Sequence, residues 1–549
     1  MIHRPLYILF LVLVSLSEMP AADLFSRYYQ NQPTRSVQVS TAMPSQLQNG
    51  ELHLTERQAI QMALENNLDI NVERYAPLLS HWLIEGQRSV YDPIGRFAFH
   101  WDRTNTPTAS VLQGGTSVTN ILTTYDYGYS QTFSTGTTVE AGFVGARNRT
   151  TNFFSSLVPA IDTSFQAVIR QNLLEGFGRI APDYQIEISR NNLEISRHEF
   201  ERKAADLILQ VQDRYWELQY ALQDIEVKEK SLQLAETVLE QNQARLEIGT
   251  AARLEVVQAE AESALRRAEL IRSQFGRRRI QDQLIKLISN FEDPRDFPAQ
   301  IVLADPVYTP DTIEASFDQL AASAGELRPE LQEAELQVIN QEVNLDLSRN
   351  RLKPTLDLVA GYQQFGLGGT RVVRDFSQGF IDAPIVDVIP GGLGDSLAQL
   401  FSSDFYGYVV GLDFRIPIFN TEARAQNAEA QLALNRSQLS KRSLEQTVAL
   451  EIRDALTQVE MNQARLEAAA VAVRSARERL EGEQVRFDVG LGTTRELIEA
   501  QRDLLLAESV ELQTRVDLIK SHNLLDRAVG RTFARQGIRL DDALQVNLR

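Results

Sequence analysis

The stretch that decides the fold occurs twice in the chain. It reads RLEIGT at 245–250 followed by LEVVQA at 254–259, and then RFDVGL at 486–491 followed by ELIEAQ at 496–501. In each copy an apolar-periodic segment stops at a glycine, and a second such segment begins a few residues later. Glycine adopts the left-handed conformation that ends many helices without a side-chain clash. The two stretches therefore predict two helical hairpins, with tips at Gly249 and Gly490.

The segments before both tips carry apolar residues at a strict spacing of seven. A seven-residue repeat keeps one apolar seam only when helices supercoil around each other. An arm from Tyr184 to Leu246 would be roughly 95 Å long at about 1.5 Å per residue, too long for a compact domain of this size. We therefore predict extended antiparallel coiled coils. The seam positions lie 241 residues apart (452 − 211 = 241) and are Val211, Leu218, Ile225, Leu232, Leu239 and Leu246 in the first copy and Ile452, Val459, Leu466, Val473, Leu480 and Phe487 in the second.

Matching signals also open each half of the chain. A capping-box pattern at 55–58 returns at 316–319, an offset of 261 (316 − 55 = 261), and the offset persists from Pro93 to Pro354. The first half has 156 residues between its proline and its tip glycine, and the second has 136, a difference of 20 (156 − 136 = 20). The chain is therefore predicted to be an internal duplication whose first repeat has an enlarged insert.

The segments after these prolines alternate apolar and polar residues with period two, which predicts β-strands. Strands with aromatic side chains on one face suit a membrane β-barrel, although a soluble sandwich alternates in the same way. One chain offers four to six such strands, with a glycine-rich loop expected from Gly366 to Ser403. A barrel in lipid must close, so it would have to be shared by several copies of the chain. The apolar positions are Phe97, Phe99, Trp101, Tyr125, Tyr127, Tyr129, Phe133, Val139, Ala141, Phe143, Phe165, Ala167, Ile169, Leu356, Leu358, Tyr362, Tyr406, Tyr408, Val410, Leu412, Phe414 and Ile416.

Residues 1–22 have the pattern of a secretory signal peptide, with basic residues before an apolar run at 6–16 and small residues at 21–22. A membrane anchor is the alternative, for which this run is short. Residues 23–53 are predicted to form a flexible lead-in. The net charge of −18 argues against a nucleic-acid partner. The absence of cysteine excludes disulfides and thiolate metal sites.

Taken in order, these motifs resemble the TolC-like outer membrane efflux proteins. The resemblance rests on both tips and on LTERQAI (54–60), QNLLEGFG (171–178), RPEL (328–331), LKPTL (352–356) and RIPIF (415–419). It implies an α+β fold in which long coiled-coil hairpins form a periplasmic α-barrel. It also implies a homotrimer whose membrane strands build one shared twelve-stranded transmembrane β-barrel, four strands from each chain.

The resemblance also sets the expected organisation of the chain. A first repeat is predicted at 54–300, with a helix, strands at 94–171 and a hairpin at 183–290. A second repeat is predicted at 316–532, with a helix, strands at 355–418 and a hairpin at 422–530. The expected linker is 301–315, and the expected C-terminal tail is 533–549.

Acidic residues follow both tips. Glu496 and Glu499 are three residues apart and share one helix face, and Glu255 holds the same place after the first tip as Glu496 does after the second. From position alone these are solvated first-turn acids stabilised by the helix dipole. The resemblance instead implies a periplasmic gate that selects cations. It also implies tips that contact a periplasmic adaptor, at Gly249, Thr250, Gly490 and Leu491.

The function implied by the resemblance is an outer membrane exit duct, located in the outer membrane with a periplasmic extension. Such a duct passively conducts substrates from an adaptor and an inner-membrane pump to the exterior, and contacts outer membrane lipid. The alternative is a non-channel, extended coiled-coil protein such as an adaptor. The six histidines are scattered without the spacing of metal ligands. The sequence therefore predicts no enzyme activity, metal or cofactor.

Overall fold

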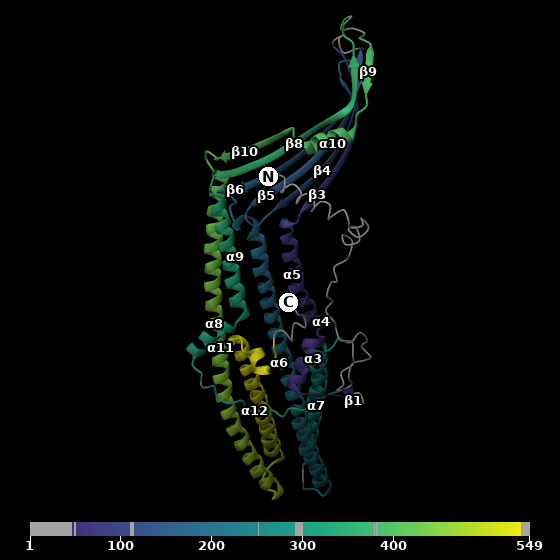
Figure 1. Cartoon of the computed structure of the whole chain (residues 1–549). Helices are drawn as coiled ribbons and strands as arrows, with labels where there is room; N and C mark the ends of the chain where they lie inside the picture. Colours follow the sequence, from purple (N-terminus) through teal and green to yellow (C-terminus); the bar gives the residue numbers. More distant parts are fainter. Residues whose placement is uncertain are drawn as a thin grey trace.

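The computed structural model describes residues 47–48, 51–109, 115–250, 252–290, 300–313, 315–377, 379 and 383–539. The predicted signal peptide, most of the lead-in and the end of the C-terminal tail lie outside these residues. The described chain forms a long column of helices, with a β-sheet at one end and two hairpin tips at the other (Figure 1).

Two helical hairpins of matching dimensions form the column. The first consists of α6 (Ile180–Glu247) and α7 (Arg253–Ile288), and the second of α11 (Thr421–Asp488) and α12 (Thr494–Val529). Both α6 and α11 have 68 residues, which makes each about 100 Å long. Gly249 and Gly490 have φ angles of +80° and +77°, so the predicted left-handed helix ends are confirmed.

Shorter helices complete the half of the column next to the sheet. Helix α5 (Tyr75–Arg88) packs against α6, and α9 (Pro329–Arg351) packs between α6 and α11. In the tip half, α7 and α12 take these places beside α6 and α11, and α12 also contacts α6 (Figure 1). Four helices of one chain therefore lie side by side at either level of the column.

A small equatorial region joins the two levels. Helices α3 (Glu56–Asn66) and α8 (Phe317–Leu327) begin there, and both predicted capping boxes are present. Next to α3 are α4 (Leu68–Glu73), α13 (Thr532–Gln536) and a three-stranded sheet of β1 (Leu47–Gln48), β2 (Glu51–Leu54) and β7 (Gln300–Leu303). Strand β7 pairs in parallel with β2, so the expected linker at 301–315 begins inside a strand, and the lead-in ends in one.

The apolar seam is buried in this equatorial region, and near the tips its burial differs between the two hairpins, where Phe487 is 1% exposed. Val211, Leu218, Ile452 and Val459 are at most 2% exposed, whereas Leu246 near the tip is 37% exposed. The largest cluster of buried apolar side chains surrounds Trp216 and joins α3, α6, α7, β2 and β7. A second cluster joins α8, α11 and α12. The equator is therefore the main core of the chain.

The large sheet contains six long antiparallel strands in the order β10-β8-β6-β5-β4-β3. The four strands per chain implied by the resemblance are therefore wrong for this protein. The first half supplies four strands because its β region contains an additional hairpin, β4–β5. The strands are β3 (Ile94–Pro107), β4 (Ser117–Thr132), β5 (Thr137–Thr150), β6 (Leu157–Asn172), β8 (Thr355–Arg374) and β10 (Tyr406–Arg415).

The loop predicted from Gly366 to Ser403 is also wrong. Strand β8 continues to Arg374 and pairs with β9 (Ile385–Ile389), after which α10 (Leu393–Ser402) packs back onto β8 and β6. Glycine permits this close packing, since a Cβ at Gly366 would lie 2.0 Å from the Ser396 carbonyl oxygen. Gly366 and Gly368 therefore form a contact surface for α10 within a strand rather than part of a loop.

The strand register confirms the predicted alternation. Cross-strand partners place aromatic residues on one face of the sheet, such as Phe97 opposite Tyr127 and Tyr362 opposite Tyr408. Charged residues lie on the other face, where Arg96 pairs with Asp126 at 2.8 Å. Among the helices of the described residues, we find none that combines the length and the apolar character needed to span a bilayer.

Candidate functional site

The two hairpin tips pack against each other through a small apolar cluster. Phe487 and Leu497 of the second hairpin are 1% and 0% exposed, and they contact Val238 and Ala259 of the first. These four residues come from α11, α12, α6 and α7. The cluster therefore holds all four helix ends together.

Polar contacts reinforce this packing. Arg245 donates from Nη2 to the Phe487 carbonyl oxygen at 3.3 Å, and its guanidinium carbon lies 4.1 Å from the centre of the Phe487 ring. The Thr494 hydroxyl lies 3.3 Å from both Asn242 Oδ1 and Glu255 Oε2, so it can donate to either one. Glu255, a predicted gate residue, thus contacts the opposite hairpin.

The other two predicted gate residues have local partners. Glu496 completes a capping box, in which its Oε2 accepts hydrogen bonds from Thr493 N at 2.9 Å and Thr493 Oγ1 at 3.0 Å. The bond from the Thr493 backbone lowers the pKa of Glu496. Glu499 accepts from Arg495 Nε at 2.9 Å, and this hydrogen bond lowers its pKa. Both acids are half-exposed, and their role in a gate stays a prediction.

The predicted adaptor-contact residues lie at the exposed ends of the hairpins. The positions where a Cβ would stand on Gly249 and Gly490 are open space, Thr250 is exposed, and Leu491 is 77% exposed. The structure adds two residues that the sequence analysis missed. Ile248 and Val489, directly before the two glycines, are 75% and 63% exposed. An apolar residue just before a helix-ending glycine is the signal that could have identified them.

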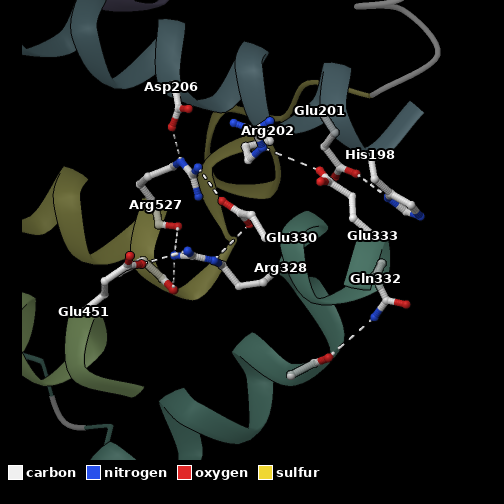
Figure 2. Close-up of polar contacts among 12 residues, drawn as sticks. His198, Glu201, Arg202, Asp206, Arg328, Glu330, Gln332, Glu333, Glu451 and Arg527 are labelled. Carbon is white, nitrogen blue, oxygen red and sulfur yellow. Dashed lines mark hydrogen bonds and ion pairs between the residues drawn. The ribbon is translucent and has the colours of Figure 1, made fainter. Parts of the chain in front are cut away.

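A buried polar network at the equator was also missed, although its RPEL motif was noted (Figure 2). The Arg328 side chain is 5% exposed. It donates to the Ala528 carbonyl oxygen at 3.0 Å, and it pairs with Glu451 at 2.7 Å and Glu330 at 3.1 Å. Arg328, at the start of α9, therefore binds both the C-terminal end of α12 and the side of α11.

Arg527 extends this network to the first hairpin. Its Nε lies 2.7 Å from Asp206 Oδ1 on α6, and its Nη2 lies 2.8 Å from Glu330 Oε1 (Figure 2). Burial tends to raise the pKa of Glu330, but the hydrogen bond and charge of Arg527 outweigh burial and lower it. The network of Asp206, Arg328, Glu330, Glu451 and Arg527, which we call the equatorial network, thus joins α6, α9, α11 and α12.

Comparison with known proteins agrees with this geometry. The family model described as outer membrane efflux protein matches residues 159–290 and 320–531, one segment in each repeat. The chain belongs to this family. The resemblance stated from the sequence is therefore confirmed, as are the location in the outer membrane and the exit-channel function that it implied.

Solved structures of outer membrane channels share the fold of this outer membrane efflux protein. The CmeC channel of Campylobacter jejuni has a TM-score of 0.61 at 15% identity, with 89% of this chain and 88% of that chain covered. The outer membrane protein VceC of Vibrio cholerae has a TM-score of 0.59 at 14% identity, with 86% of this chain and 96% of that chain covered. The open state of the MtrE channel of Neisseria gonorrhoeae has a TM-score of 0.57 at 17% identity, with 91% of this chain and 97% of that chain covered. The search of curated proteins returned no match.

Glu330 and Glu333, two acids of α9 in this efflux protein, should change the stability of the fold with pH in opposite directions. Glu330 has a lowered pKa and contributes stability above its ordinary pKa, which is lost as the pH falls through its folded-state value. Burial raises the pKa of Glu333, outweighing the nearby Arg202 at 3.5 Å, so its ionised form costs stability at neutral pH. Glu330→Gln should therefore destabilise the protein at neutral pH, by about 2 kcal/mol. Glu333→Gln should stabilise it by a smaller amount.

Thermal melting of the assembled protein from pH 7 down to about pH 3 checks both variants. Both differences from the wild type should shrink as the wild-type carboxyls become protonated. Shifts of the same sign at pH 7 would contradict the assigned roles of these two acids.

Proposed function

We propose that three copies of this chain form a passive exit duct, joined to a periplasmic adaptor and an inner-membrane pump. The observation that carries the proposal is the large sheet, whose outer strands β3 and β10 have no partner beyond them among the described residues. An unpaired strand edge is not tolerated in hydrocarbon. Pairing β3 of one copy with β10 of the next removes every edge and closes a barrel.

The aromatic face of this sheet supports its place in the membrane. Phe97, Trp101, Tyr127 and Tyr408 are each at least 50% exposed in the single chain. A face of this kind suits contact with lipid, while the polar face suits a water-filled lumen. A coiled-coil adaptor that spans no membrane would expose these side chains to water, so the exit duct is the better account.

The assembly itself is the first test. Protein extracted from the outer membrane in mild detergent should run as a trimer in native mass spectrometry, with no folded monomer at any dilution that preserves the sheet. A stable monomer that inserts into lipid bilayers would overturn the shared barrel.

The apolar tip residues Ile248, Val489 and Leu491 support the proposed adaptor contact. Exposed apolar side chains at a helix end suit packing against the helical tips of another protein. The proposed duct is therefore oriented with its tips toward the adaptor and its sheet in the outer membrane.

Glu496 and Glu499 are proposed to make the duct prefer cations. Three copies would bring six carboxylates around one axis, where they attract cations and repel anions. We expect Glu496→Gln combined with Glu499→Gln to lower the potassium-to-chloride permeability ratio about two-fold or more. Folding should change little, because glutamine at the third helical position can also complete a capping box.

Reversal potentials in a potassium chloride gradient across a planar bilayer measure this ratio. Glu460→Gln combined with Glu467→Gln is the matched control, since both acids are exposed on α11 away from the tip. Equal reversal potentials for the tip variant, the control and the wild type would show that these glutamates do not set the selectivity.

A further inference from the structure

We infer that every copy contributes six strands to the wall of the barrel, so that the proposed trimer closes an eighteen-stranded barrel (three copies of six strands). This inference rests on the trimer proposed above. It follows from the place of the additional hairpin β4–β5, from the pattern of its side chains and from the width of the sheet.

The hairpin β4–β5 is an addition within the wall. Strands β3 and β8 both begin directly after a proline, Pro93 or Pro354, and β6 and β10 both lead into a long helix. These four strands are thus the duplicated set. Strands β4 and β5 lie between β3 and β6 and pair with them over almost their full lengths.

The side chains of β4 and β5 match those of their neighbours on both faces. Tyr127 of β4 lies between Phe97 of β3 and Phe143 of β5, with ring centroids 4.9 Å and 6.3 Å away. On the opposite face, Asp126 of β4 pairs with Arg96 of β3 at 2.8 Å. The hairpin therefore continues both the aromatic face and the polar face of the sheet.

The turn of the hairpin is fixed where the sheet meets the helices. Gly136 has a φ of +78°, and a Cβ there would lie 2.5 Å from the Gly176 carbonyl oxygen. The Thr135 carbonyl oxygen accepts hydrogen bonds from Gly178 N at 3.3 Å and Gln171 Nε2 at 3.2 Å. These contacts place β4 and β5 above the helical column at the same level as the duplicated strands.

The width of six strands matches the width of four helices. Helices packed about 8–10 Å apart give four of them about 32–40 Å of the circumference. Six strands about 4.8 Å apart and tilted by about 40° occupy about 38 Å, whereas four strands would occupy about 25 Å. The barrel is therefore as wide as the helical tube below it.

Helix α10 leaves this wide lumen free. Ser396 and Leu400 of α10 are buried against β8 and β6, and Ser396 Oγ lies 2.7 Å from Thr163 Oγ1. Thr163 and Phe165 are two residues apart on β6, so α10 covers the aromatic face. Since that face is turned toward lipid, α10 lies outside the barrel. Cargo size is then limited at the hairpin tips and not at the membrane exit.

Electron cryo-microscopy of the intact protein in lipid nanodiscs tests this inference directly. A section through the membrane should show eighteen strands around a three-fold axis. Twelve strands from three copies, with β4–β5 outside the wall, would overturn it, and so would twelve strands from two copies. A protein with either of these barrels would still conduct ions, so the proposed exit duct would survive. Loss of conduction would count against the duct itself.

Cysteine pairs give a second readout, because the chain has no cysteine of its own. Ala98→Cys on β3 is combined in turn with Val409→Cys, Gly411→Cys or Asp413→Cys on β10. Four strands separate β3 from β10 in one chain, about 24 Å, which is too far for a disulfide. A covalent trimer in one of these registers supports the three-copy closure on which the inference rests, and the strand count from microscopy then decides between eighteen and twelve strands. A covalent dimer as the end product, or no link in any register, contradicts it.

Discussion

Replacing Arg328 with methionine should lower the stability of the assembled protein by about 3–5 kcal/mol, because it removes one partner of a buried ion-pair network. Methionine fills much of the same volume, so the loss is electrostatic rather than a cavity effect. The variant leaves Glu330 with Arg527 alone and leaves Glu451 without its 2.7 Å partner. It also removes the donor to the Ala528 carbonyl oxygen at the end of α12.

Arg349→Met is the matched control for this prediction. Arg349 lies on the same helix, and its ion pair with Asp346 at 3.2 Å is more than half exposed on both sides. Such a pair contributes about 0–1 kcal/mol. Adding Glu451→Gln to Arg328→Met should recover part of the lost stability, since it removes the carboxylate that Arg328→Met leaves without its partner. Thermal melting of the assembled protein measures all three variants, and equal shifts for Arg328→Met and Arg349→Met would refute the role of the network.

The second large effect is expected at the tips. Phe487→Ala should remove about 3–5 kcal/mol of packing from the cluster that joins the two hairpins. It also removes the ring on which the Arg245 guanidinium stacks at 4.1 Å. The main core around Trp216 is at the equator, so the proposed trimer should remain assembled. We expect the tips to separate and the open probability in planar bilayers to rise several-fold.

Val485→Ala is the control for the tip variant. Val485 lies two residues earlier on α11 and is 62% exposed, so its truncation removes little packing. Single-channel recording compares open probability, and native mass spectrometry confirms that each variant is a trimer. If Phe487→Ala and Val485→Ala have the same open probability, the apolar cluster does not hold the tips closed.

The sequence was sufficient for features that depend on local signals. The seven-residue repeat and the glycines at 249 and 490 predicted both hairpins, and the capping boxes marked the start of each repeat. The number of strands was predicted only as four to six, because alternation does not show which strands pair. Gly366 and Gly368 were predicted to lie in a loop. Their packing partners on α10 are about 30 positions further along the chain (396 − 366 = 30), and no local sequence signal reveals that contact.

The site could be predicted only in part for a similar reason. The tips were identified from their glycines and from the family resemblance. The contact between Glu255 and Thr494 joins residues 239 positions apart, so it depends on how the two hairpins align. The equatorial network depends on carbonyl groups at the end of α12, which no motif marks. RPEL indicated where Arg328 lies but not what it binds.

Conductance of the purified assembly, proposed to be a trimer, in a planar lipid bilayer tests the central claim, that this chain forms a water-filled exit duct. The account predicts discrete current steps from the trimer, with a preference for cations that falls in the Glu496→Gln and Glu499→Gln double variant. A trimer shown to be folded and inserted in the bilayer that carries no current, in the wild type and in Phe487→Ala alike, would contradict it.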